Sequence, residues 1–168
     1  MRVAVTGTPG TGKTTATDRL ETDLEVVHLN EIVREEGLDA GTDEKRDSVV
    51  ADLDAVAEYL TDRDDIVVES HLAHHLDVDR VVVLRCDPER IETRLADRGE
   101  SPKTRRENAE SEALDLILSE AVTAHGEESI YEIETTEQTP DKTAQAIEAA
   151  IAGTREPSAG TVDYTSYL

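Results

Sequence analysis

The sequence predicts an α/β fold with a mainly parallel sheet that is covered by helices on both faces. Short β-branched runs alternate with amphipathic segments along the 168-residue chain, which is typical of parallel strands joined by helical crossovers. A glycine-rich loop separates the first strand from the first helix and reads Gly7-Thr8-Pro9-Gly10-Thr11-Gly12-Lys13-Thr14. Because it fits the phosphate-loop (P-loop) pattern G-x-x-x-x-G-K-[ST] at every fixed position, we expect a P-loop nucleoside triphosphatase fold.

The loop has the residue types that a bound triphosphate requires. Gly10 and Gly12 let the backbone fold around a phosphate, and N–H groups at the helix start point toward the anion. Lys13 carries a mobile positive charge for the β- and γ-phosphates, and the hydroxyl of Thr14 can ligate Mg²⁺. The alternative is a plain glycine turn with an exposed lysine. The spacing G-x-x-G-x-G disfavours a dinucleotide site, which needs G-x-G-x-x-G.

Length and composition favour a single domain over residues 1–168, without a membrane span. No run of eighteen apolar residues occurs, and a membrane-spanning helix needs about that length. The N-terminus leads directly into a strand without an apolar signal region, so we expect a cytoplasmic protein. A single cysteine, Cys86, excludes an internal disulfide and a zinc cluster of cysteines.

The chain is strongly acidic, with a net charge of −22 from 39 acidic and 17 basic residues. Such acidity can indicate disorder, but the alternation of apolar strands and amphipathic helices favours a folded protein. We interpret it as adaptation to molar salt, hence a halophilic source. The Debye length there is about 3 Å, so surface repulsion largely disappears. The charge leaves no basic patch for nucleic acid, whereas a basic protein partner is compatible with it.

The first part of the chain predicts two strands on either side of the loop helix. Residues 2–5 are an apolar run suited to a buried parallel strand, and residues 14–20 can form the helix after the loop. Residues 25–29 form a short second strand. Asn30 is a suitable N-cap for a helix that continues to about residue 36.

A polar loop, a helix and a third strand come next. Residues 37–47 are polar and contain two glycines, so we expect a mobile loop. In residues 46–59 apolar side chains recur at helical spacing, which predicts a helix. The β-branched run 66–68 ends at Glu69. In a parallel sheet this end lies at the edge where the first strand also ends and where ligands bind.

The remaining sequence predicts two further strands and three helices. Residues 80–85 are the clearest strand of all. A helix begins at Asp87-Pro88, where an N-cap residue precedes proline, and ends near Gly99. A longer helix over residues 101–125 follows, with a kink. The last elements are a strand at 130–133, a helix at 140–152 and a tail without periodicity at 154–168.

Three separated motifs together point to a narrower protein family than the phosphate loop does alone. They are the loop with its additional threonine Thr15, then Arg34-Glu35-Glu36-Gly37, and finally Arg98-Gly99 with Arg106-Glu107-Asn108. In this combination the chain resembles the adenylate kinase isoenzyme 6 family, the archaeal and nuclear adenylate kinases, over roughly residues 1–152. The resemblance implies a P-loop nucleotide kinase domain with an NMP-binding segment at 28–51 and a short lid at 97–107. Both stretches suit hinged covers that exclude water.

The resemblance also implies the reaction and the residues that perform it. The reaction would be ATP + AMP giving two ADP, with Mg²⁺ as the cofactor. Arg34 would hold the acceptor, because a guanidinium fork suits phosphate, and Arg98 would stabilise charge on the transferred group. Either arginine could instead be an ordinary surface residue. The ATP phosphates would be held by Gly10, Gly12, Lys13, Thr14 and Thr15.

The third strand ends in Glu69-Ser70-His71, where the resembled family usually has Asp-x-His. The carboxylate of Glu69 would serve Mg²⁺ together with Thr14. It is one methylene longer than aspartate, which leaves direct coordination or contact through a water open. His71 stands at a strand end beside the phosphate site, so we expect it to act in catalysis with Lys13 and Arg98.

Several residues fall outside these expected phosphate sites. His74 and His75 lack a third ligand nearby in the sequence, so we interpret them as surface residues rather than a metal site. Cys86 is expected to be buried at a strand end. The family commonly has an aromatic residue where this chain has Thr42 and Glu100. These two departures leave the preferred acceptor base open.

Two function classes follow from the resemblance. The first is a nucleoside monophosphate kinase. The second is an ATPase that acts chiefly as a ribosome assembly factor in small-subunit and rRNA maturation and binds a basic small-subunit ribosomal protein. The expected acceptor segment with Arg34 favours the kinase, because a plain ATPase needs no acceptor pocket. An unrelated small-molecule kinase on the same loop is a third possibility, given Thr42 and Glu100.

The acidic composition predicts that folding depends on salt. In dilute buffer the unscreened carboxylates repel one another, so we expect loss of structure or activity, and recovery in molar KCl. Circular dichroism and thermal melts across a KCl series measure this directly. Full stability at ~0.1 M salt, where charges still interact over about 10 Å, would contradict the prediction.

Overall fold

A parallel five-stranded sheet forms the centre of the structure, a computed structural model that describes residues 1–43 and 48–168. The strand order is β2-β5-β1-β6-β7, and every neighbouring pair runs parallel. The predicted mainly parallel sheet is therefore confirmed. Its strands are β1 (Arg2–Thr6), β2 (Glu25–His28), β5 (Ile66–Glu69), β6 (Arg80–Arg85) and β7 (Ile130–Glu134).

Successive residues of a strand point to opposite faces, and both faces of this sheet are apolar. In β1, Val3 and Val5 belong to one buried cluster, whereas Ala4 between them belongs to the other. In β6, Val82 belongs to the same cluster as Val3 and Val5, whereas Val83 belongs to the cluster of Ala4. This explains why the strands read as continuous apolar runs, the pattern of parallel strands that are covered on both sides.

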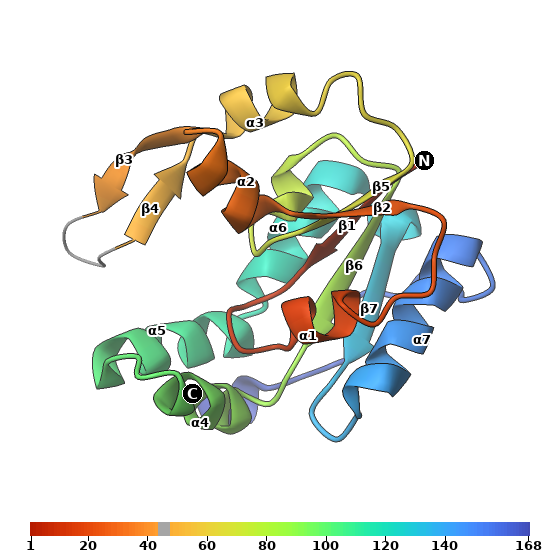
Figure 1. The fold of residues 1–168 in the computed structure, drawn as a ribbon. Coiled ribbons are helices and arrows are strands. Elements are labelled where there is room, and N and C mark those ends of the chain that lie inside the picture. Colours follow the sequence, from red (N-terminus) through yellow and green to blue (C-terminus); the bar gives the residue numbers. More distant parts are fainter. Residues whose placement is uncertain (44–47) are drawn as a thin grey trace.

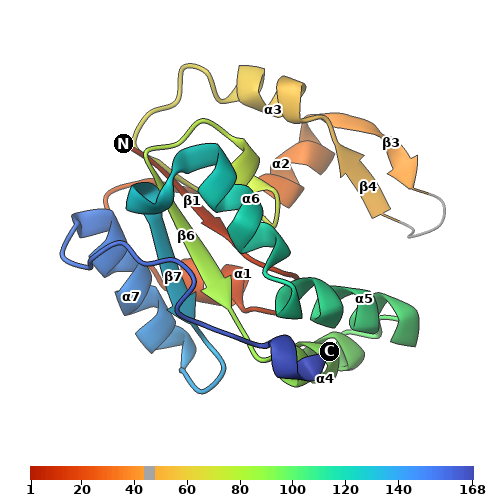
Figure 2. The same ribbon diagram turned by 180° about the vertical axis from the view of Figure 1, so that it is seen from behind.

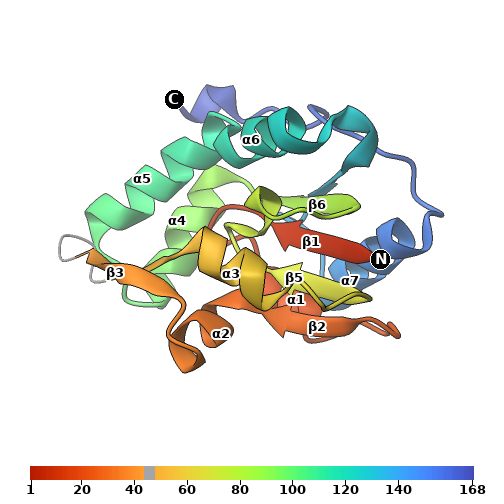
Figure 3. The same ribbon diagram turned by 90° about the horizontal axis from the view of Figure 1, so that it is seen from above.

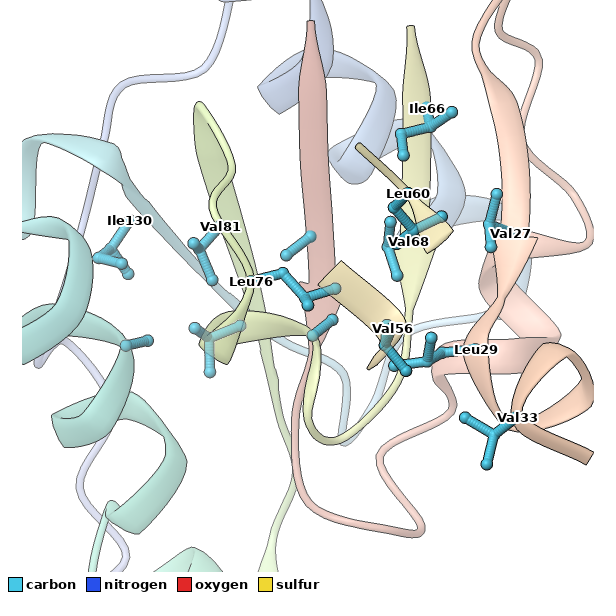
Figure 4. Close-up of a cluster of buried hydrophobic side chains, with 14 of the residues drawn as sticks. Val27, Leu29, Val33, Val56, Leu60, Ile66, Val68, Leu76, Val81 and Ile130 are labelled. Carbon is cyan, nitrogen blue, oxygen red and sulfur yellow. The ribbon is translucent and has the colours of Figure 1, made fainter. Parts of the chain in front are cut away.

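Helices cover both faces, as the sequence predicts (Figures 1 and 2). On one face, α1 (Lys13–Thr17) and α7 (Pro140–Ala152) contribute Ala16, Ile147 and Ala150 to the core. The other face packs against α2 (Leu29–Glu35), α3 (Leu53–Tyr59) and α6 (Leu116–His125). Figure 4 shows this second cluster, in which strand residues such as Val27, Val68 and Val81 meet Leu29, Val33, Val56 and Leu60.

The region after β2 differs from the prediction. Asn30 is not the N-cap of α2, because the helix begins two residues earlier than predicted, at Leu29, with His28 in the N-cap position. Within the predicted loop 37–47, β3 (Asp39–Asp43) forms an antiparallel pair with β4 (Ser48–Ala51). Residues 44–47, which include part of the predicted loop and helix, lie outside the described residues.

The predicted helix 46–59 is therefore too long. Residues 48–51 form the strand β4, and α3 begins only at Leu53. The carboxylate of Asp52 accepts a hydrogen bond from the Ala55 N–H at 3.1 Å and caps the helix. Val49 and Val50 satisfy a helical spacing, but their β-branched side chains also suit a strand. In this chain the strand forms.

Two helices replace the single helix predicted over residues 101–125. They are α5 (Pro102–Ala113), which packs against α4 (Pro88–Asp97), and α6. The chain turns at Asp115, which has a left-handed backbone with φ 54°. The expected cap at Asp87 forms, since its side chain accepts backbone N–H groups of α4. The side chain of Ser101 likewise accepts a backbone N–H group and caps α5. The expected kink is a complete break.

The tail lies against the domain. Both the N–H and the hydroxyl of Thr161 donate to Glu132, at 2.7 and 2.8 Å, and Tyr164 donates its hydroxyl to Glu134 at 2.8 Å. Tyr167 in the short helix η3 (Thr165–Tyr167) donates to Glu92 of α4. Among the residues that the structure describes, no helix combines the length and apolarity needed to cross a bilayer.

A buried arginine connects the sheet to α5 and to the start of α6. Arg85, at the end of β6, is 1% exposed. Its Nε donates to Glu112 of α5 at 2.8 Å, its Nη1 donates to Glu132 of β7 at 2.6 Å, and its Nη2 donates to Asp115. The guanidinium also lies 5.6 Å from the ring centre of Tyr164. One buried cation thus satisfies three carboxylates.

Replacing this arginine is expected to destabilise the fold strongly. Arg85→Ala leaves the buried carboxylates of Glu112 and Glu132 unpaired, which typically costs about 3–5 kcal/mol of unfolding free energy. Denaturant titration in molar KCl measures it. The matched control is Arg90→Ala, which should cost less than about 1 kcal/mol. Within the described residues the Arg90 side chain makes just one polar contact, an exposed one of 3.5 Å with Glu137. Equal effects of the two variants would contradict the assignment.

Candidate active site at the phosphate loop

The phosphate loop joins β1 to α1 and depends on glycine for its conformation. Gly7 has φ 145°, and a Cβ there would lie 2.5 Å from the carbonyl oxygen of Leu84, so any side chain would collide with β6. Gly12 has φ 90° and is the N-cap residue of α1. Thr11 donates both its N–H and its hydroxyl to the carbonyl of Thr8, at 3.2 and 2.8 Å. The loop is therefore a tight turn held by its own hydrogen bonds.

Lys13 is folded into this turn. Its ammonium donates to the carbonyl oxygens of Gly7 at 2.8 Å and Thr8 at 3.2 Å, and only 8% of the residue is exposed. Burial lowers the pKa of Lys13 to about 8, an effect that the charge of Glu69 opposes and that of Arg98 reinforces. The lysine is thus mostly charged at neutral pH and lies close enough to Glu69 and Arg98 to interact electrostatically with both.

Glu69 ends β5 beside the loop. It pairs in register with Val5 of β1 on one side and with His28 of β2 on the other. The Oε2 atom accepts a 2.9 Å hydrogen bond from Nδ1 of His28, whose Nε2 lies 3.2 Å from Asp18. Burial lowers the pKa of His28, but the hydrogen bond and charge of Glu69, together with Asp18, leave it above its ordinary value. His28 therefore orients the carboxylate.

The side chains here fit Mg²⁺. Glu69 is buried, and only its Oε2 atom is hydrogen-bonded within the described part of the chain. The hydroxyl of Thr14, on the exposed side of α1, also makes no hydrogen bond to described residues. A carboxylate and a hydroxyl are hard oxygen donors, the kind that Mg²⁺ prefers. Glu69 and Thr14 thus have oxygen atoms left for an ion.

His71 is half-buried two residues after Glu69. Burial lowers its pKa to about 4, helped by the positive charge of Lys13 and by His74 and His75. The imidazole is therefore neutral at physiological pH. Its side chain makes no hydrogen bond among the described residues, so both ring nitrogens remain available close to Lys13.

A pocket of about 370 Å³ opens beside the loop. One wall is the loop and α1, a second is the last turns of α4, and a third is the segment that leads into α7. Thr135 of this third wall donates its hydroxyl to the carbonyl of Thr11 at 2.9 Å. The lining residues include Gly10, Gly12, Thr15, Arg94, Asp97, Arg98, Thr135, Gln138, Pro140 and Thr143.

Arg94 is a loop contact that the sequence reasoning missed. Its Nη1 atom donates to the carbonyl of Gly10 at 3.0 Å, so α4 supports the loop directly. Arg94 precedes Arg98 by four residues, which is the spacing of neighbours on one helix face. That spacing was the signal that could have identified it.

Glu112 was also missed, and no sequence signal could have identified it. It is an acid in the polar helix α5, but it is 3% exposed. Its Oε2 atom accepts a 2.5 Å hydrogen bond from the hydroxyl of Thr8, while Oε1 accepts from Arg85 and from the Cys86 N–H. Through Glu112, the phosphate loop is bonded to α5.

The structure brings most of the predicted site residues together but leaves one apart. Gly10, Gly12, Thr15 and Arg98 line the pocket, whereas Lys13 and Thr14 do not. Glu69 and His71 lie close enough to Lys13 for electrostatic interaction. Arg34 lies on the last turn of α2, is exposed, and makes no hydrogen bond or ion pair with any described residue. It does not line the pocket beside the loop.

The expectation for His74 is wrong. His74 is 1% exposed, and its ring lies between Thr6 of β1 and Glu120 of α6. Packing of α6 against the short helix η1 (Ala73–His75) covers it, and the sequence gives no sign of this long-range contact. His75 is exposed as expected. Cys86 is fully buried at the end of β6, which confirms its predicted position.

Known proteins are similar to this chain in sequence and in fold. A family model described as an AAA domain matches residues 3–115. A shikimate kinase from Acinetobacter baumannii, solved in complex with shikimate, superimposes with a TM-score of 0.63 over 92% of this chain and 94% of that chain. At 19% identity this similarity concerns the fold, which is that of P-loop kinases.

Closer relatives extend over the complete chain. A Natronomonas pharaonis protein described as "Putative adenylate kinase" is 66% identical, and one from Halobacterium salinarum with the same description is 62% identical, each over 100% of both chains. Both organisms are halophilic archaea, consistent with the acidic composition. A Methanosarcina acetivorans relative is 42% identical over 90% of this chain and 86% of its own. The chain therefore belongs to the archaeal adenylate kinase family that these relatives represent.

Proposed function

We propose that this chain is a nucleoside monophosphate kinase that transfers the γ-phosphoryl group of ATP to AMP and gives two ADP. The observation that carries the proposal is that Glu69, His71 and Arg98 all lie close enough to the loop lysine Lys13 to interact with it electrostatically. Arg98 also lines the pocket beside the loop. Phosphoryl transfer needs this combination of cations, a metal-binding carboxylate and a shaped cavity. The names of the archaeal relatives support the same activity.

The proposed chemistry needs positioning rather than a covalent enzyme intermediate. Lys13 leaves the loop carbonyls that it now contacts and binds the β- and γ-phosphate oxygens, which are stronger acceptors for an ammonium. Arg98 closes from the end of α4 onto the transferred group. Arg94 holds the loop at Gly10 while this happens. His71, neutral at physiological pH, hydrogen-bonds near the reacting phosphates without adding charge.

Thr14 and Glu69 would hold Mg²⁺, with His28 fixing the orientation of the carboxylate. When bound, the ion neutralises phosphate oxygens and orients the polyphosphate for in-line transfer. The buried position of Glu69 keeps its charge in a fixed place beside Lys13. Its extra methylene, relative to the aspartate that the family usually has, alters reach but not the kind of donor atom.

Two segments are proposed to close over the nucleotides. The acceptor segment, residues 28–51, contains α2 with Arg34 and the β3–β4 hairpin. The lid, residues 97–107, extends from the end of α4 through Gly99, which has φ 83°, into the first half of α5. Figure 3 shows the hairpin and α5 at the end of the molecule toward which β1 points, where ligands of parallel sheets bind. Closure would bring Arg34 from its exposed position to the acceptor phosphate.

The second candidate is an ATPase that assists maturation of the small ribosomal subunit by binding a basic ribosomal protein. The net charge of −22 favours a basic partner. Adaptation to salt explains the same charge, so this observation separates the candidates weakly. The two activities differ in product: the kinase forms ADP only when a monophosphate is present, whereas the ATPase releases free phosphate without one.

Incubation with Mg-ATP in molar KCl, with and without each monophosphate, tests the proposal. We expect ADP formation that depends on AMP, with little free phosphate. Lys13→Ala should abolish the activity, because the phosphates lose their main cation. Phosphate release that no monophosphate changes would overturn the kinase assignment and favour the ATPase.

Arg34→Ala should damage only transfer to the acceptor. Loss of a charge-assisted phosphate contact of about 1.5–3 kcal/mol predicts a roughly tenfold or larger rise in the KM for AMP, with ATP binding nearly unchanged. Steady-state kinetics with each nucleotide varied in turn measure the two effects separately. Arg90→Ala, which removes an exposed arginine that does not line the pocket beside the loop, is the control. Unchanged AMP kinetics in Arg34→Ala would show that Arg34 is an ordinary surface residue.

Substitution of Glu69 tests the metal-binding carboxylate. Glu69→Gln keeps the size of the side chain and one hydrogen-bond acceptor but removes the charge, so the Mg²⁺ concentration for half-maximal activity should rise about tenfold or more. Glu69→Asp retains the charge and should keep substantial activity. Equal Mg²⁺ dependence in wild type and Glu69→Gln would exclude this role.

A further inference from the structure

A second cluster of ligand-type side chains lies between η1 and α6 and shares no residue with the phosphate loop. It consists of His74, His75 and Glu120, whose nearest nitrogen and oxygen atoms all lie within 4.8 Å of one another. We propose that this cluster binds one divalent transition-metal ion of the zinc type. The proposal concerns a site separate from the Mg²⁺ position at Thr14 and Glu69.

The spacing of the three side chains fits a shared ion. The Nε2 atom of His74 lies 2.9 Å from Oε2 of Glu120, and Nε2 of His75 lies 3.7 Å from the same oxygen. Bonds of 2.0–2.2 Å in a tetrahedral arrangement place neighbouring ligand atoms about 3.4 Å apart. The two distances lie on either side of this value. The longer one exceeds a hydrogen bond, so His75 directs its nitrogen at the carboxylate without bonding to it.

The buried histidine is prepared for this role. Its Nδ1 atom lies 3.0 Å from the hydroxyl of Thr6, which leaves Nε2 directed at Glu120. Metal-binding histidines usually have their second ring nitrogen hydrogen-bonded in this way, which fixes the ring.

The backbone around the histidines is also fixed. The N–H groups of Ala73, His75 and Leu76 donate to carbonyls three residues earlier, at 3.0–3.1 Å. His125 of α6 lies 2.7 Å from the carbonyl oxygen of His74 through its Nε2 atom. A site held by such supporting bonds loses little entropy when it binds an ion. His75 and Glu120 are exposed, so an ion can enter and a water can complete its coordination.

The ligand atoms of the cluster indicate which class of metal it would bind. Two imidazole nitrogens and one carboxylate oxygen suit Zn²⁺, Co²⁺ or Ni²⁺, whereas Mg²⁺ and Ca²⁺ prefer oxygen ligands. A bound ion would also replace the His74–Glu120 hydrogen bond with two stronger bonds between η1 and α6. Because Thr6 directly precedes the loop residue Gly7, such a bridge would join the base of the phosphate loop to α6.

The direct test is Zn²⁺ titration of the full chain by calorimetry, in molar KCl with excess Mg²⁺ to fill oxygen-only sites. We expect one Zn²⁺ per chain, and a visible Co²⁺ absorption spectrum of low-symmetry, four-coordinate type. Zn²⁺ should also raise the thermal midpoint, because it binds the folded state.

His75→Ala and Glu120→Gln should each weaken Zn²⁺ binding about tenfold or more. Both residues are exposed, so these variants should fold.

Two controls make the result decisive. Glu127→Gln removes an equal charge from an exposed position just beyond α6 and should leave Zn²⁺ affinity unchanged. His71→Ala should also leave it unchanged, because His71 is not in the cluster. Absence of stoichiometric Zn²⁺ binding, or equal affinity in wild type, His75→Ala and Glu120→Gln, would overturn the proposal. Loss of binding in His71→Ala would assign the ion to the phosphate site and overturn it equally.

Discussion

The ion-pair network of Arg85 is the interaction on which the rest of the site depends. A guanidinium buried at the end of β6 holds Glu112, and Glu112 in turn accepts the hydroxyl of Thr8 in the phosphate loop. The same arginine holds Glu132, to which Thr161 of the tail also donates. The loop, α5 and the C-terminal segment are therefore connected to the sheet through this one buried cation. Burying this cation is tolerable only because each partner is placed to pair with it.

The sequence predicted the fold where the pattern is local. Strands appear as β-branched runs, and Asp87 and Ser101 mark helix starts through caps that form within three residues. The prediction from sequence failed where tertiary contacts determine which secondary structure forms. The Val49–Val50 pair suits either a helix or a strand, and pairing with β3 favours the strand. The break at Asp115 accompanies its ion pair with the distant Arg85, which no local pattern reveals.

The residues of the candidate site likewise fall into those that the sequence reveals and those that only the folded structure reveals. Residues within the phosphate loop are contiguous and could be found from spacing alone, and Glu69 and His71 from their place at a strand end. Their supporting partners come from other elements: His28 is 41 residues from Glu69, and Glu112 is 104 residues from Thr8. Such pairs exist only after the sheet has formed. Sequence spacing therefore identifies the residues that would touch a ligand, but not the distant residues that hold those side chains in place.

The distribution of tyrosines has a practical consequence for spectroscopy. The chain has four tyrosines and no tryptophan, so its near-ultraviolet signal comes from very few places. Tyr164 and Tyr167 belong to the tail, and Tyr131 forms a bridge with Ser158 of the same tail. Tyr59 is in α3, and its ring centre lies 5.6 Å from the guanidinium of Arg63. Intrinsic fluorescence of this protein should therefore report mainly whether the C-terminal segment is docked, while far-ultraviolet dichroism reports the helices and the sheet.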